Sequence, residues 1–168
     1  TLERVRQLIG EADRRFSRDS GGWYMAESGD QNLVLRPFDT YDAVRPSGNS
    51  RLLDAHLRLA TLAGDNKGFA TVQKSLGAYG QLAGQAGLGM AGWLDVALRH
   101  GGPFYEVVIA GDPGHPQTAA LQQVWKDLSP PWAVRVDISS KGPTAAQVKA
   151  LPPVDAKRGK DGGPLAYV

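Results

Sequence analysis

The sequence predicts a mainly helical fold that ends in a small α/β appendage. Through the first hundred residues, apolar side chains recur at the spacing of amphipathic helices, with charged residues between them. Beyond residue 100, glycine and proline are concentrated, and short strand-like apolar runs replace most of the helical pattern. We therefore expect two domains, a helical one at 1–102 and an α/β one at 103–168.

The helical domain contains four predicted helices and one long loop. Turn residues at 19–22 end the first helix, and Asn49 or Ser50 is expected to cap the second. Residues 23–26 and 33–35 are expected to pair as a small β-hairpin within the loop. The four helices are predicted at 2–18, 50–62, 67–84 and 88–99.

The appendage reads as a strand–helix–strand unit. Residues 105–110 have the composition of a buried strand, 117–128 are periodic as a helix, and 132–138 alternate as a half-buried strand. Such a unit favours parallel, right-handed pairing of its strands. The last four residues are a candidate third strand, and 139–163 are expected to be irregular.

Composition excludes several classes of function. A net charge of +2 with scattered basic residues gives no support for a nucleic-acid partner. No apolar stretch approaches the roughly 18 residues that a membrane span requires. There is no cysteine, and the three histidines lack metal-ligand spacing, so we expect neither a metal nor another cofactor. A cytoplasmic location is expected.

The loop at 33–50 is the most informative stretch. It is longer than the usual connection of about 4–6 residues, yet it is rich in apolar side chains that disordered segments normally lack. We therefore expect an ordered, packed loop that lines a cavity.

Short blocks along nearly the whole chain carry a family resemblance. They lie at 21–24 (Gly-Gly-Trp-Tyr), 26–27, 35–37, 41–42, 46–50 (Pro-Ser-Gly-Asn-Ser), 57–59, 61–65, 106–112 and 162–168. In this order the blocks resemble the last part of a family of large thioredoxin-domain proteins. Its members join an N-terminal thioredoxin-like domain to an (α/α)6 toroid, similar to six-hairpin glycosidases and N-acylglucosamine 2-epimerases.

The resemblance implies that the four helices are hairpins of a toroid. Four helices cannot close a ring of twelve and would leave apolar faces exposed, which soluble monomers normally avoid. We therefore expect a fragment or a subunit whose partners are the missing N-terminal half of the toroid and the thioredoxin-like domain. These partners belong either to the same protein or to a separate chain.

Two candidate residues in the loop have competing interpretations. Arg36 is able to hold a carboxylate or sugar hydroxyls, and Asp42 is able to act as an acid or base. Alternatively, the two residues pair with each other or fix the loop through backbone hydrogen bonds. Met25, Phe38 and Ala43 stand where the family commonly has Asp, Lys and Gly, which removes two ionisable groups from the expected site.

The remaining candidates also have structural alternatives. Glu27 and Asp30 are a candidate pair of glycosidase carboxylates, but their spacing equally suits a turn. His56 is either a satisfied core residue or a group at the ring centre. Ser47 and Asn49 are turn and cap residues or ligands. Trp23 is the tryptophan best suited to stack on a sugar ring.

Two functions follow from these patterns. The first is binding of a carbohydrate-like or other small polar ligand in the ring centre, with a role in carbohydrate metabolism. The second is a non-catalytic scaffold or interaction module that positions the thioredoxin-like domain. The sequence leaves open whether the chain is an enzyme.

Overall fold

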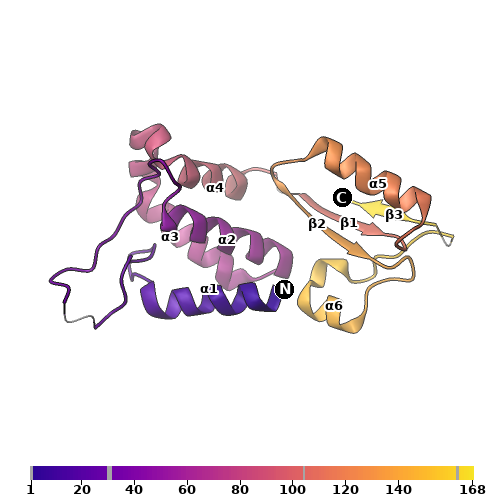
Figure 1. The fold of residues 1–168 in the computed structure, drawn as a ribbon, viewed down its shortest axis with the longest axis horizontal. Helices are drawn as coiled ribbons and strands as arrows, with labels where there is room; N and C mark the ends of the chain where they lie inside the picture. The colour runs from indigo at the N-terminus through magenta and orange to yellow at the C-terminus, as the bar shows by residue number, and fades with distance from the viewer. Residues whose placement is uncertain (1, 30–31, 104, 162) are drawn as a thin grey trace. The chain divides into compact units, whose positions relative to one another are not determined.

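The computed structural model describes residues 2–29, 32–103, 105–161 and 163–168, and these form two compact units (Figure 1). The first unit comprises Thr1–Ala60 and Asp65–Gly102, and the second comprises Thr61–Gly64 and Pro103–Val168. About 54% of the structure is helical and the sheet is small, which confirms the expectation of a mainly α fold with a small β-containing appendage.

All four predicted helices of the first unit are present. They are α1 (Leu2–Phe16), α2 (Gly48–Ala63), α3 (Asn66–Ala86) and α4 (Ala91–Gly101), and a short 3-10 turn, η1 (Gly87–Met90), leads into α4. Asp65 caps α3 by accepting a hydrogen bond from the Lys67 backbone N–H. The predicted cap of α2 is wrong, because the helix begins earlier and the Ser47 hydroxyl accepts from the Ser50 N–H at 3.1 Å.

The four helices of the first unit share one apolar core. Trp93, Leu53, Met90 and Val72 are fully buried there, and Phe16 of α1 packs against the same cluster. Removing this much apolar surface from water is the main stabilising contribution to such a unit. The core lies beside the loop 17–47, so it provides a rigid base for the candidate residues.

The predicted β-hairpin at 23–26 and 33–35 is absent. The backbone groups that would form its ladder pair elsewhere: the Tyr24 N–H donates to the Phe16 carbonyl, and the Met25 N–H donates to the Pro37 carbonyl, each at 2.8 Å. Gly22 turns the chain here with a φ of 74°, and a Cβ at this position would lie 2.9 Å from Oδ1 of Asn49.

The loop is also less packed than its composition predicts. Val34, Leu35 and Val44 have exposed fractions of 106%, 81% and 101%, and Tyr41 is half exposed. Phe38 is the exception, since its ring lies against Tyr79 with centroids 5.1 Å apart. The expectation that the apolar side chains of this loop are buried is therefore wrong for this chain.

The second unit contains the predicted strand–helix–strand arrangement. Strand β1 (Tyr105–Ala110) pairs in parallel with β2 (Ala133–Ile138), and α5 (Pro116–Leu128) connects them. The third strand, β3 (Leu165–Tyr167), pairs antiparallel with β1, so the sheet order is β2-β1-β3. Parallel pairing of the first two strands is as predicted.

A short helix covers one face of this sheet and α5 lies against the other (Figure 1). Helix α6 (Ala145–Ala150) and the 3-10 turn η2 (Pro152–Val154) lie in the segment that was expected to be irregular. Thr144 and Gln147 form a capping box at the start of α6, a signal that the sequence interpretation missed. In the described part of the chain, no helix is both long and apolar enough to span a bilayer.

Candidate functional site

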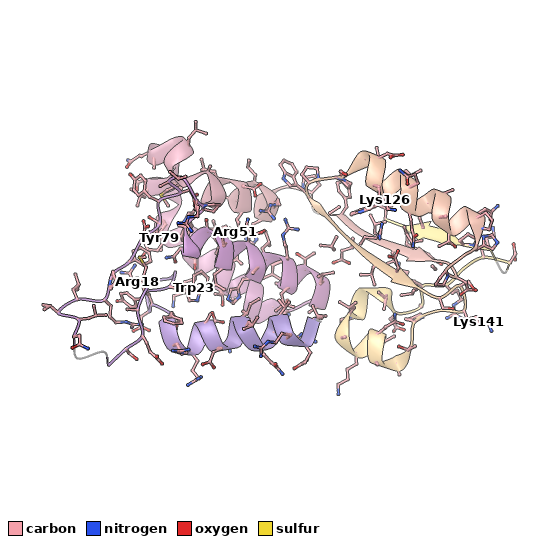
Figure 2. All side chains as sticks on the ribbon, viewed as in Figure 1. Arg18, Trp23, Arg51, Tyr79, Lys126 and Lys141 are labelled. Atoms are coloured by element: carbon pink, nitrogen blue, oxygen red, sulfur yellow. The ribbon has the colours of Figure 1, made fainter. Side chains whose placement is uncertain are left out.

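The candidate residues gather where the loop 17–47 meets the first turns of α2. Figure 2 shows Arg18, Trp23 and Tyr79 in this part of the helical unit. The loop runs over buried polar side chains, and their hydrogen bonds decide which of the competing interpretations the geometry favours.

Asn49 joins two distant points of the loop. Its side chain is buried, and its Oδ1 accepts from the Trp23 N–H at 2.7 Å. Its Nδ2 donates to the carbonyl oxygens of Trp23 at 2.8 Å and Asp39 at 2.7 Å. Buried main-chain groups need such partners, and Asn49 supplies them for a segment without a regular ladder.

Asp42 accepts three hydrogen bonds. Its Oδ1 receives the Ser47 N–H and the Ser50 hydroxyl, and its Oδ2 receives the Gly92 N–H, each at 2.7 Å. Burial alone would raise the pKa of Asp42, but these donors outweigh it and hold the pKa below its ordinary value. A carboxylate in these surroundings fastens the loop to α2 and α4 and is poorly suited to take up a proton.

Arg36 also bonds to the backbone. Its Nε and Nη2 donate to the Ala26 carbonyl at 3.0 and 2.9 Å, and Nη2 reaches the Arg15 carbonyl at 3.1 Å. The guanidinium lies 3.9 Å from the centroid of the Tyr24 ring. The alternative in which Arg36 pairs with Asp42 is therefore wrong, and the alternative of backbone hydrogen bonds is confirmed.

Trp23 and His56 form a buried pair. Their rings stack with centroids 5.2 Å apart, and both donate toward one oxygen of Asp13, with Trp23 Nε1 at 2.8 Å and His56 Nε2 at 3.0 Å. Burial raises the pKa of Asp13, but the His56 and Trp23 hydrogen bonds outweigh it and the pKa is lowered. This arrangement ties α1 to α2 and matches the interpretation of His56 as a satisfied core residue.

Glu27, Asp30 and Ser47 are the remaining predicted candidates. Glu27 forms an exposed ion pair with Arg15 at 2.7 Å, and this hydrogen bond lowers the pKa of Glu27. Asp30 lies outside the described residues, so the proposed carboxylate pair has no geometry here. Ser47 is the cap of α2, as described above.

Arg18 was not predicted as part of this region. Its guanidinium lies 3.9 Å from the centroid of the Phe38 ring, 5.0 Å from that of Tyr24 and 5.8 Å from that of Tyr79, whose hydroxyl it also contacts. The Phe38 ring receives this guanidinium in a cation–π contact. The sequence signal for this cluster was a basic residue, Arg18, followed in the loop by the aromatic residues Tyr24 and Phe38.

A hollow with a volume of about 310 Å³ opens beside this cluster. Its lining includes Trp23, Tyr24, Asp39, Asn49 and Leu52, which combines aromatic, carboxylate, amide and aliphatic groups. The volume lies at the lower end of the roughly 300–1,000 Å³ that small-molecule sites occupy.

Sequence reasoning missed an ion cluster on the other side of Asp42. Arg99 of α4 is 4% exposed and pairs with Asp54 of α2 and Asp95 of α4. The signal was an aspartate four residues before an arginine in each of two helices, Asp54 with Arg58 and Asp95 with Arg99.

Among the described residues, no group of three or more histidine, cysteine or acidic side chains is arranged to hold a metal ion. No protein-family model matches this sequence, and none of the curated proteins is significantly similar to it.

Proposed function

We propose that this chain is the C-terminal portion of a thioredoxin-domain toroid protein and that it serves there as a non-catalytic scaffold and interaction element. In this proposal residues 1–102 are hairpins of an (α/α)6 ring. Its partners are the N-terminal hairpins that complete the ring and, separately, a thioredoxin-like domain.

One observation carries the scaffold role. The polar candidates Arg36, Asp42 and Asn49 bond to the chain itself, while Val34, Leu35 and Val44 of the same loop are exposed. Fully burying one such apolar side chain contributes roughly 1.5–3 kcal/mol. A fixed loop that presents apolar groups is suited to binding a neighbouring hairpin.

Hydrogen exchange tests this role. The amides of residues 33–46 should exchange faster in the 168-residue chain alone than in an assembly that contains the other hairpins and the thioredoxin-like domain. A matched readout is Val72 in the core of the first unit, whose amide should be protected in both samples. Equal exchange of the loop in both samples would contradict the proposal.

A second candidate function is binding of a small polar ligand of the carbohydrate type. The hollow of about 310 Å³ favours it, because Tyr24 and Asp39 offer an aromatic ring and a carboxylate beside Trp23. Titration with a panel of monosaccharides, observed at the Trp23 indole N–H by NMR, tests it. Saturable shifts that Asp39→Asn weakens would support this function, and shifts that Asp39→Asn leaves unchanged, or none at all, would oppose it.

A further inference from the structure

The ion cluster of Arg99 borders a second hollow in the helical unit. This hollow has a volume of about 220 Å³ and is lined in part by Asp42, Arg51, Asp54, Leu88, Asp95 and Arg99. Figure 2 labels Arg51, which lies on α2. The volume is below that of sites for drug-sized molecules and suits a smaller ligand.

Most of the charged groups around this hollow are already engaged. Asp42 accepts its three hydrogen bonds from Ser47 of the loop, Ser50 of α2 and Gly92 of α4. Asp54 receives both Arg58 and Arg99. Arg99, which is 4% exposed, is held by Asp54 and by one oxygen of Asp95.

Two charged groups of opposite sign at this hollow are still able to form an ion pair with a ligand. In the part of the chain that the structure describes, the Arg51 guanidinium has no ion pair, and Asp95 uses Oδ2 alone for Arg99 and is half exposed. The Nε of Arg99 is in addition buried without a hydrogen-bond partner among the described residues. Leu88 and neighbouring small side chains give the same hollow an apolar wall.

We propose that this hollow binds a small zwitterion of the free α-amino acid class. The ligand carboxylate pairs with Arg51, whose planar guanidinium matches a carboxylate in two parallel hydrogen bonds. The ligand ammonium group pairs with the free oxygen of Asp95, and the ligand side chain lies toward Leu88. Arg99 positions Asp95 by holding its other oxygen.

This site is separate from the carbohydrate-type hollow beside Trp23 and does not depend on the scaffold role. A ligand with a single charge would satisfy one of Arg51 and Asp95 and leave the other unpaired. A zwitterion forms both ion pairs where a singly charged analogue forms one, so the arrangement favours ligands that carry both charges.

The test uses the 168-residue chain and free L-leucine, with binding measured by NMR at the Arg99 Nε–H and the Gly92 backbone amide. N-acetyl-L-leucine, which lacks the ammonium group, and L-leucinamide, which lacks the carboxylate, are the ligand controls. Alanine and glutamate extend the panel to other side chains.

The expected result is a saturable shift with at least one free amino acid and a loss of affinity of about tenfold for each ligand control. Arg51→Gln should weaken binding by a similar factor. Arg14→Gln removes the same charge from α1, where the arginine is exposed and pairs with Glu11, and it should leave the affinity unchanged.

Three results would overturn the proposal. They are no saturable shift with any free amino acid, equal binding of the acetylated or amidated analogue, and equal effects of Arg51→Gln and Arg14→Gln. Because Arg51 is exposed and the analogues are tested on the unchanged chain, none of these results depends on a variant that fails to fold.

Discussion

Each unit fastens a long connecting segment with an aspartate that accepts three hydrogen bonds, but the two aspartates differ in burial. Asp42 receives the Ser47 and Gly92 N–H groups and the Ser50 hydroxyl, and it is partly buried. Asp112 receives the hydroxyls of Ser139 and Ser140 and the Ser140 N–H, and it is exposed.

The two aspartates differ in what takes their place when a hydrogen bond is lost. Around Asp112, water replaces a lost hydrogen bond at little cost. Around Asp42 and Asn49, lost hydrogen bonds leave buried donors without a partner, which is far more costly. Similar hydrogen-bonding patterns therefore contribute differently to stability. The residues that looked like ligands from the sequence are those that hold the loop through buried hydrogen bonds.

The largest effect is expected for Asn49→Ala. This change leaves the buried N–H and C=O of Trp23 without their partner and should lower the free energy of unfolding by about 3 kcal/mol. Urea unfolding measures it. Asn66→Ala, at an exposed position of α3, is the control and should change stability little.

Asp42→Asn and Asp112→Asn test whether burial makes the hydrogen bonds of Asp42 more important for stability than those of Asp112. The first change should cost about 2 kcal/mol, because an amide cannot accept from all three donors and presents its own N–H group to them. The second should have a clearly smaller effect on the same urea curves. Equal losses in the two variants would refute the role assigned to burial.

Low pH should weaken the hydrogen bonds that Asp42 and Asp112 accept. The Ser140 and Ser139 hydrogen bonds lower the pKa of Asp112, and the loop donors lower that of Asp42 against the effect of burial. Since both folded-state pKa values lie below the ordinary value of about 3.9, this stabilisation is complete above that pH and is lost as the pH falls through the lowered values.

Melting temperatures between pH 6 and the acid range check this dependence, with pH values chosen on either side of about 4. In Asp42→Asn the acid-induced loss should be smaller than in the unchanged chain, because one of the titrating groups is gone. An identical acid dependence of the two proteins would count against the contribution of Asp42.

The smallest effect is expected for Glu27→Gln. Both partners of the Arg15–Glu27 ion pair are exposed, and exposed pairs contribute little because solvent screens them. The melting temperature should stay within experimental error. A marked destabilisation would show that the edge of the loop matters as much as its buried side.

The helices and the parallel strand pair were predictable because their periodicity is local. The strand–helix–strand unit at 105–138 needed only neighbouring residues and turn signals. The capping box of Thr144 and Gln147 was also local and went unrecognised.

The site was less predictable because its contacts link distant residues. Asn49 reaches Trp23 across 26 positions, and Asp42 reaches Gly92 across 50. No spacing rule connects such residues, so side chains that hold a loop and side chains that bind a ligand look alike in one sequence. The false hairpin had the same cause, since Tyr24 and Met25 found partners at Phe16 and Pro37.

Native-state hydrogen exchange of three amides tests the central claim most directly. The N–H groups of Trp23, Ser47 and Gly92 donate to Asn49 or Asp42. If these side chains hold the loop, all three amides exchange slowly, with protection similar to the helices of the core, and Asn49→Ala selectively removes the protection of Trp23. Exchange of Trp23 and Ser47 at the rate of an unstructured peptide in the unchanged chain would contradict the account.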